Sequence, residues 1–335
     1  MKLLFIGGTG LISSACSDLA IQRGHELFLL NRGLSTRYQP PAGATVLQAD
    51  LRTDEERLAD LLASRRFDAV VDFMAFGLSD IERDLRLFRG RTDQFVFISS
   101  ASAYQKPPQN YLITEETPLE NPFWQYSRDK IVCEERLMKA YREDGFPVTI
   151  VRPSLTYGPS QIAMIGSSWQ HPYTIVDRIK RGKKVIMPGD GTSLWVVTWN
   201  GDFAVGLLGL LGNPKAIGEA FTITSDEVLT WNQLLAELYS ALGVAPNIVH
   251  IPSDLIVAYD PDSLGSLIGD KINSVVFDTS KIKRFVPEFR CDVKWSEGIR
   301  RTLEWFEADP SRQTIDPAMN ETWGRIIAGY EKAFP

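Results

Sequence analysis

The chain has 335 residues, of which 44% are hydrophobic, and its formal net charge is −6 at pH 7. This length and composition predict a folded protein with either one large two-lobed domain or two ordinary domains. The acidic balance argues against a surface for nucleic acid, and the sequence lacks the apolar stretch of about 18 residues that a membrane span needs.

Cysteines and histidines are few and widely spaced. The three cysteines, Cys16, Cys133 and Cys291, form no metal-binding or redox pattern, and the three histidines are equally scattered. Such cysteines are typical of reduced thiols. The sequence therefore predicts a soluble, cytoplasmic protein that holds no metal and binds neither nucleic acid nor a membrane.

The first fifty residues have the order of a nucleotide-binding unit. Residues 2–6 are a short apolar strand, and Gly7-Gly8-Thr9-Gly10 leads from it into a segment with helical spacing. Gly7 allows a tight turn, and Gly10 lets the backbone approach a pyrophosphate, whose charge the helix N-terminus stabilises. Ser13 takes the place of a third small residue. A plain loop is the alternative, but the preceding strand favours a cofactor site. Its candidate contacts are Gly7, Thr9, Gly10, Leu11 and Ile12.

The residues after the second predicted strand, 26–30, bear on the choice of cofactor. NAD-binding units usually place an acid there to bind the adenosine 2′-hydroxyl, whereas this chain has Asn31 and Arg32. A guanidinium pairs well with a phosphate, so Arg32, with Arg37 as a second candidate, favours NADP over NAD. A solvated loop arginine is the alternative.

Further cofactor candidates follow the third and fourth predicted strands, 45–48 and 68–72. Asp50, just after the third strand, either meets the adenine or caps the helix that follows it. The remaining candidates in these two places are Leu51, Met74 and Ala75.

Apolar runs alternate with helical patterns as far as residue 151, which is typical of a parallel sheet covered on both faces. After the third strand the sequence predicts helices over 54–64, 79–88 and 123–142, and strands over 68–72, 94–98 and 148–151. We therefore expect residues 1–152 to form an α/β dinucleotide-binding domain of the Rossmann type, with a doubly wound parallel sheet.

The alternation ends after residue 152. Residues 153–200 are rich in Gly, Pro and Trp, and 220–223 is a candidate for one strand that returns to the sheet. Helices are predicted near 201–211, 230–242 and 296–307. We expect residues 153–335 to form mainly a smaller, substrate-binding lobe over the carboxyl ends of the strands.

A tyrosine and a lysine on the long predicted helix are the best candidates for chemistry. Tyr126 and Lys130 share a helix face because they are four positions apart. An ammonium beside a phenol is expected to lower the phenol pKa, which would make Tyr126 an acid/base near neutral pH. A serine at the carboxyl end of the fifth strand, in the run Ser99-Ser100-Ala101-Ser102, places a hydroxyl where ligands bind in such sheets. Tyr-x-x-x-Lys alone is common by chance, but joined to the glycine turn and this serine it predicts an active site.

In these motifs and their order, the chain resembles the extended short-chain dehydrogenase/reductase family, in its NAD-dependent epimerase/dehydratase group. The matching segments are Gly7 to Ile12, Asp50-Leu51, Ser99 to Tyr104, Tyr126 to Lys130, Arg152 to Pro159, and Pro188 to Gly191 ahead of Asp202. The resemblance implies that Tyr126 is the acid/base and that Lys130 holds the nicotinamide ribose and tunes Tyr126. It also implies that Ser100, four residues before Tyr104, hydrogen-bonds the reacting oxygen, and that Pro153 lies near the nicotinamide.

Two departures from the family pattern narrow the expected activity. Ala101-Ser102 stands where dehydratases carry an Asp-Glu pair, which argues against dehydration. Leu155 and Trp195 stand where relatives that act on nucleotide-linked sugars tend to have an Asn and a diphosphate-binding Arg. We therefore expect a small-molecule substrate, namely a sugar, a sugar acid or a related carbonyl or carbinol compound. A UDP-sugar could bind if another arginine reached the site from the smaller lobe, and Arg178 and Arg181 are the nearest candidates in sequence.

Three tryptophans, Trp169, Trp195 and Trp199, lie in the region expected to face the active site, where an indole can stack on a sugar ring. Packing within the lobe is the alternative. The candidate substrate contacts are Ser102, Trp169 and Trp195.

These features predict an NAD(P)-dependent dehydrogenase/reductase or epimerase in which hydride leaves a carbinol carbon as Tyr126 takes the hydroxyl proton. A nucleotide-sugar epimerase is the alternative among enzymes, since it begins with the same hydride step. A non-catalytic, dinucleotide-sensing or RNA-associated protein is a third possibility. Relatives of that kind commonly lose the tyrosine or the lysine, and this chain has both. A homodimer is a possible assembly.

Overall fold

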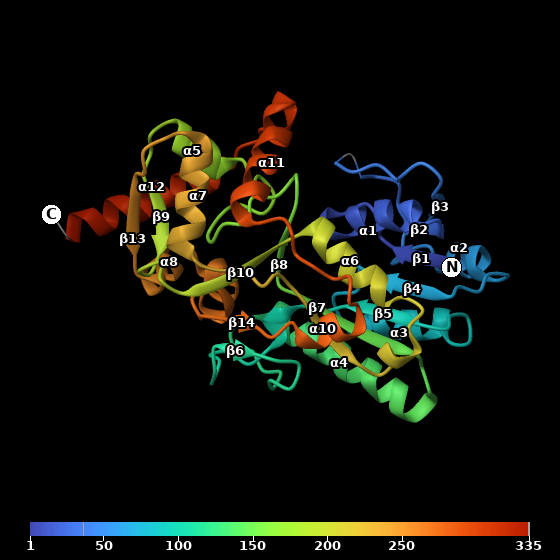
Figure 1. The fold of residues 1–335 in the computed structure, drawn as a ribbon. Helices are drawn as coiled ribbons and strands as arrows, with labels where there is room; N and C mark the ends of the chain where they lie inside the picture. The colour runs from blue at the N-terminus through green and yellow to red at the C-terminus, as the bar shows by residue number, and fades with distance from the viewer. Residues whose placement is uncertain (36, 334–335) are drawn as a thin grey trace.

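A seven-stranded parallel sheet forms one end of the molecule in the computed structural model, which describes residues 1–35 and 37–333 (Figure 1). Its strand order is β11-β7-β5-β4-β1-β2-β3. The strands are β1 (Lys2–Ile6), β2 (Glu26–Asn31), β3 (Thr45–Gln48), β4 (Ala69–Asp72), β5 (Phe95–Ile98), β7 (Val148–Pro153) and β11 (Ala220–Ile223). All neighbours are parallel, so the predicted doubly wound α/β fold is confirmed.

Helices cover both faces of this sheet because both faces are apolar. Side chains alternate along a strand, so Leu3 and Phe5 of β1 face one core while Leu4 and Ile6 face the other. The first core is covered by α1 (Leu11–Gln22), α6 (Asn200–Leu210) and α10 (Ser280–Phe285), and the second by α2 (Glu55–Leu62), α3 (Leu78–Phe88) and α4 (Gln125–Asp144). Three of these elements, α6, β11 and α10, lie beyond residue 152, so the chain returns to the large sheet after it first leaves it.

The rest of the chain forms a smaller lobe at the opposite end of the molecule from the N-terminus (Figure 1). It contains three small sheets, with the orders β12-β10-β8, β13-β9 and β14-β6. Their strands are β6 (Leu112–Ile113), β8 (Leu155–Tyr157), β9 (Val185–Pro188), β10 (Leu194–Trp199), β12 (Val228–Thr230), β13 (Ile248–Ile251) and β14 (Val276–Phe277). The helices of this part are α5 (Thr174–Lys180), α7 (Trp231–Leu242), α8 (Ser253–Tyr259), α9 (Leu264–Ser266), α11 (Trp295–Glu307) and α12 (Pro317–Ala333).

Several short helical turns complete the fold. They are η1 (Ala101–Ala103), η2 (Pro214–Ala216), η3 (Pro261–Ser263), η5 (Pro310–Arg312) and the π-helical turn η4 (Leu267–Lys271). In the part of the chain that the structure describes, no helix is long and apolar enough to cross a membrane. The same residues contain no group of three or more His, Cys, Asp or Glu that could hold a metal ion.

Candidate active site

A cavity of about 1200 Å³ lies at the carboxyl edge of the large sheet and extends into the lobe. It sits where the strand order reverses between β1 and β4, the place at which sheets of this kind bind ligands. Its volume exceeds the range of about 300–1,000 Å³ that is usual for a single small-molecule pocket. The cavity therefore has room for two ligands side by side.

The cavity wall contains all but one of the site residues that the sequence predicts. They are Gly7, Thr9, Gly10, Leu11, Ile12, Asn31, Arg32, Asp50, Leu51, Met74, Ser100, Ser102, Tyr126, Lys130, Pro153, Trp169 and Trp195. The exception, Ala75, is fully buried behind the wall, and its carbonyl accepts a hydrogen bond from Lys130.

The turn between β1 and α1 depends on its glycines. Gly7 and Gly8 have φ angles of +106° and +87°, a region that other residues avoid. A Cβ on Gly8 would approach Leu29 Cδ2 to 2.5 Å. The N–H of Gly10 donates to Ser13 Oγ at 2.9 Å, so Ser13 fixes the start of α1 as well as packing in the core. The first amides of α1 consequently face the cavity, where they can stabilise an anion.

Asn31 and Arg32, at the end of β2, have different roles, because the first fixes the backbone and the second faces the cavity. The Asn31 side chain fixes the backbone, since Nδ2 donates to the Gly7 carbonyl at 3.3 Å and Oδ1 accepts from Gly33 N at 2.9 Å. The Arg32 side chain is 60% exposed, and its Nη1 lies 3.8 Å from Asp50 Oδ2. Arg32 is thus positioned to meet a ligand in the cavity, whereas Arg37 does not line it.

The structure excludes one of the two roles considered for Asp50, that of a helix cap. The helix α2 begins at Glu55 with Asp54 as its N-cap residue, so the expectation that Asp50 could cap this helix is wrong. Asp50 Oδ1 instead accepts from Arg52 N at 2.9 Å, and the residue lines the cavity. The intervening residues form a separate turn that moves the helix start away from Asp50.

Three serines after β5 have different partners. Ser99 Oγ donates to buried Glu134, and Ser102 Oγ accepts from Ser127 Oγ at 2.8 Å. Ser100 Oγ lies 2.9 Å from Ser102 Oγ, and Ser100 is the side chain that acts to lower the pKa of Tyr126. The hydroxyl that meets the candidate acid/base is therefore that of Ser100.

Lys130 is buried beside Tyr126 and reaches back to the sheet. Its Nζ donates to the carbonyls of Ala75 and Ile98 at 2.7 and 2.8 Å, and lies 5.8 Å from the centroid of the Tyr126 ring. Burial lowers the pKa of Lys130 to about 8, and the charge of Asp72 opposes that change. An ammonium has three N–H donors, so one remains for a ligand.

The expectation that Lys130 lowers the pKa of Tyr126 is wrong in this structure. Burial raises the Tyr126 pKa above its usual value, the Ser100 hydrogen bond acts to lower it, and the charge of Asp270 raises it further. The Lys130 ammonium lies over the ring and is hydrogen-bonded to two carbonyls, so it is not aimed at the phenol oxygen. Tyr126 is consequently a protonated phenol at neutral pH.

A buried ion pair joins α4 to the neighbouring strands. Arg152 of β7 donates to the Glu134 carboxylate, with Nη2 2.6 Å from Oε2, and both side chains are less than 10% exposed, at 7% and 3%. Arg152 Nη1 also donates to Tyr104 Oη at 3.1 Å, and that hydroxyl lies 2.6 Å from Thr222 Oγ1 of β11. The helix that carries Tyr126 is therefore held against the strand ends by charge as well as by packing.

The three tryptophans considered as substrate contacts have different surroundings. Trp195 is buried in the cavity wall and stacks on Trp231, with ring centroids 5.2 Å apart, whereas Trp169 lines the cavity with 61% of its surface exposed. Trp199 does not line this cavity and packs edge-on against Tyr157, which agrees with the alternative of packing within the lobe. Trp195 and Trp199 lie near opposite ends of β10, and the cavity reaches only the end that carries Trp195.

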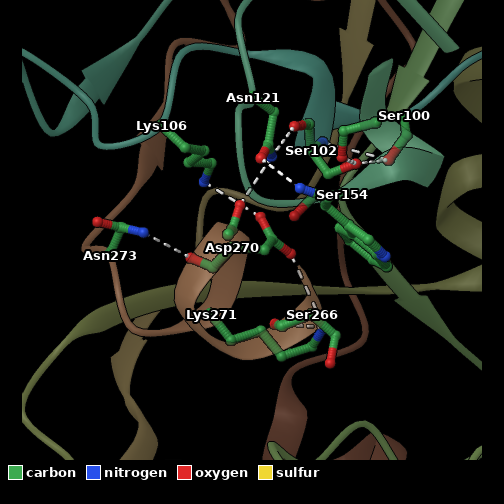
Figure 2. A network of polar contacts seen from close by, with 12 residues as sticks. Ser100, Ser102, Lys106, Asn121, Ser154, Ser266, Asp270, Lys271 and Asn273 are labelled. Carbon is green, nitrogen blue, oxygen red and sulfur yellow. Dashed lines mark hydrogen bonds and ion pairs between the residues drawn. The ribbon is translucent and has the colours of Figure 1, made fainter. Parts of the chain in front are cut away.

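A group of charged residues at the site belongs to none of the sequence motifs. Lys106 Nζ lies 3.1 Å from Asp270 Oδ1, and Lys271 Nζ lies 3.8 Å from Asp270 Oδ2. Asn121 links this group to the serines, because its Nδ2 donates to the carbonyls of Ser102 and Gly269 at 3.0 and 2.8 Å (Figure 2). These residues have no motif and come from distant parts of the chain, so no sequence pattern predicts them.

The two arginines considered for a diphosphate lie elsewhere. Arg178 is buried, and its guanidinium donates to the Lys184 carbonyl and to Asn320. Arg181 is paired with Asp177 on α5. Neither residue lines the cavity.

The sequence is similar to a known protein family and to individual proteins of known sequence. The model of the NAD dependent epimerase/dehydratase family matches residues 3–224. Over 335 aligned residues the chain is 22% identical to a UDP-N-acetyl-alpha-D-glucosaminuronate decarboxylase of Bacillus cytotoxicus, with 91% of this chain and 97% of that protein covered. It is 27% identical to the chloroplast stem-loop binding protein of 41 kDa b of Arabidopsis thaliana over 74% of this chain, and the match spans 65% of that protein.

Solved structures share the fold. The dTDP-glucose 4,6-dehydratase of Bacillus anthracis, in complex with NAD, superposes with a TM-score of 0.73 at 19% identity and covers 93% of this chain and 98% of its own. The UDP-glucose 4-epimerase of Bifidobacterium longum, in complex with NAD+ and UDP, gives a TM-score of 0.74 at 17% identity, with 94% and 100% covered.

The Glu134–Arg152 pair leads to a stability prediction. Glu134→Gln removes the charge that compensates buried Arg152, so we expect the free energy of unfolding to fall by about 3 kcal/mol. Asp93→Asn, which breaks the exposed pair with Arg66, should cost less than about 1 kcal/mol. Urea unfolding of both variants measures the difference, and equal small losses would mean that the buried pair does not tie α4 to the sheet.

Proposed function

This chain belongs to the NAD dependent epimerase/dehydratase family, and we propose that it is an NAD(P)-dependent dehydrogenase, reductase or epimerase. Its substrate in this proposal is a sugar, a sugar acid or a related small carbonyl or carbinol compound. The observation that carries the proposal is that Ser100, Tyr126 and Lys130, whose ammonium lies 5.8 Å from the Tyr126 ring centroid, line the same cavity as the glycine turn.

The residues present fit a dinucleotide. The turn at Gly7 and Gly8 has no room for side chains, and the amides at the start of α1 are free to receive a pyrophosphate. Lys130 keeps one N–H donor for a ribose hydroxyl, and Pro153 lines the same wall. When bound, the nicotinamide supplies the hydride acceptor or donor.

The chain's own residues move the proton. Because the pKa of Tyr126 is raised, its phenol is protonated and can donate to a carbonyl oxygen that Ser100 Oγ also binds. Ser100, the neighbour that acts to lower the Tyr126 pKa, then stabilises the phenolate that forms. In the reverse direction the phenolate takes the proton of a carbinol hydroxyl, so the same residues serve oxidation, reduction and the first step of an epimerisation.

The lobe side of the cavity, meaning the lining residues after Pro153, supports a small substrate. The arginines of the described chain that line the cavity, Arg32, Arg52 and Arg83, all precede Pro153, while Leu155 and Trp195 occupy the lobe side. A diphosphate there would lose its strongest contacts. The names of the decarboxylase and epimerase relatives support the second candidate function, that of an enzyme acting on a nucleotide-sugar.

An RNA-associated role is supported by one relative's name alone. Two observations argue against an RNA-associated role. The net charge is −6, and Ser100, Tyr126 and Lys130 line one cavity, although binding of RNA would not require these three residues.

The first prediction from this proposal concerns the cofactor. We expect NADP to bind more tightly than NAD, because Arg32 faces the cavity at the end of β2 and can pair with a 2′-phosphate. Arg32→Ala should weaken NADP binding about tenfold, as expected for one charge-assisted contact, and change NAD binding little. Calorimetry measures both affinities, with Arg37→Ala as the control that keeps the preference. Equal or tighter NAD binding by the unaltered protein would contradict the prediction.

The second concerns the acid/base. Tyr126→Phe removes the proton carrier and keeps the ring, so turnover should fall roughly a hundredfold or more while cofactor affinity stays nearly unchanged. Lys130→Ala should harm both turnover and cofactor binding. Absorbance of the reduced cofactor, followed with a panel of sugars and sugar acids, measures turnover. Tyr111→Phe, at a tyrosine 61% exposed, is the control, and near-normal turnover of Tyr126→Phe would refute the assignment.

The third separates the two substrate classes. UDP and UDP-glucose should bind no more tightly than about millimolar, because phosphate oxygens on the lobe side would lose water without gaining an arginine. Titration of tryptophan fluorescence measures the affinity. Saturation at micromolar concentrations would favour the nucleotide-sugar candidate.

A further inference from the structure

Lys106, Asp270 and Lys271 form a buried group of three charges, in which Asp270 and Lys271 line the lobe side of the cavity and Lys106 pairs with Asp270 without lining it (Figure 2). The two lysines approach Asp270 from different sides, and the three side chains are 2%, 12% and 17% exposed in the order given. Aromatic rings cover both ammonium groups, since Lys106 Nζ lies 5.6 Å from the Trp195 ring centroid and Lys271 Nζ lies 5.6 Å from that of Trp124. The group is therefore well shielded from solvent.

With both lysines protonated the group carries one positive charge in excess, because a single carboxylate faces two ammonium groups. The charges that act on the Lys271 pKa are those of Asp270 and Lys106, and burial lowers that pKa. Among the described residues, Asp260 is the other carboxylate on the lobe side, and the charge that raises its pKa is that of Asp262. An uncompensated buried charge is costly, and a negatively charged ligand beside Lys271 would remove that cost and favour the ammonium.

Unpartnered hydrogen-bond donors lie in the same wall. Among the described residues, buried Trp195 Nε1 and Gln161 Nε2 have no hydrogen-bond partner, and both residues line the cavity. A buried N–H without an acceptor is unfavourable. Both nitrogen atoms are themselves buried in the wall, so the positively charged side chain that lines this side of the cavity is Lys271.

We propose that the substrate carries a single carboxylate and that Lys271 is the residue that binds it. Asp270, anchored by Lys106, positions the Lys271 ammonium to bind that carboxylate. One carboxylate matches the one excess positive charge, whereas a diphosphate would bring at least two negative charges to a place that compensates one. This inference rests on the proposed function, since it names the substrate class of that same site.

Matched pairs of acids and neutral sugars test the proposal. D-Glucuronate with D-glucose, D-galacturonate with D-galactose, and D-gluconate with D-glucitol differ only in a carboxylate that replaces a hydroxymethyl group. Calorimetry on the full chain with saturating NADP measures each affinity. We expect the acid to bind at least tenfold more tightly than its neutral partner in one or more pairs.

Variants then assign the preference to Lys271. Lys271→Met should reduce the acid preference to less than about twofold, and Lys271→Arg should keep most of it because the positive charge stays. Lys183→Met, at an exposed lysine of the lobe, controls for loss of a charge and should leave the preference unchanged. NADP affinity shows whether each variant is folded, and Lys271→Gln replaces the Met variant if that one does not fold.

Three results would overturn the proposal: no binding of any acid, equal affinity for acid and neutral sugar, or a preference that survives Lys271→Met. Tighter binding of D-glucose 6-phosphate than of D-glucuronate would also overturn it in favour of a phosphate ligand. Absorbance of the reduced cofactor tests the proposed function separately. A Lys271-dependent acid preference without hydride transfer to or from any compound would refute that function and leave the carboxylate site standing.

Discussion

The buried pair of Glu134 and Arg152 is the interaction on which the geometry of the site depends. Glu134 stands one helical turn after Lys130 on α4, and its carboxylate binds Ser99 at the end of β5 and Arg152 in β7. The direction of α4 is therefore fixed relative to two strand ends at once. Because Tyr126 and Lys130 lie on that helix, their distances from the cofactor turn and from Ser100 follow from this anchorage.

The two sides of the cavity are formed by different kinds of chain segment. The cofactor side consists of strand ends and the glycine turn, where backbone groups and a few side chains supply the contacts. The lobe side consists of segments far apart in the chain, among them the loop at Gln161, strand β10 and the turn η4. Family membership indicates what the cofactor side binds, whereas the chemistry of the lobe side depends on residues particular to this chain. The substrate class must accordingly be argued from the lobe side.

This division also explains what the sequence could predict. Each strand of the large sheet lies within two residues of its predicted position, because buried parallel strands are continuous apolar runs between helical patterns. The short strands of the lobe, such as β8, and the charges around Asp270 depend on pairing across long stretches of chain. The error about Tyr126 has a physical cause as well. Spacing along a helix places Lys130 on the right face, but burial and the direction of the ammonium decide the pKa, and neither follows from spacing.

Asp270 connects the two sides electrostatically. Its charge raises the pKa of Tyr126 and also lies between the ammonium groups of Lys106 and Lys271. A substrate carboxylate at Lys271 would add negative charge to this group and would push the Tyr126 pKa in the same direction as Asp270 does. A positive charge near the phenol would push it the other way. Binding of an anionic substrate would therefore favour the protonated phenol, which is the form of Tyr126 that donates a proton to a carbonyl.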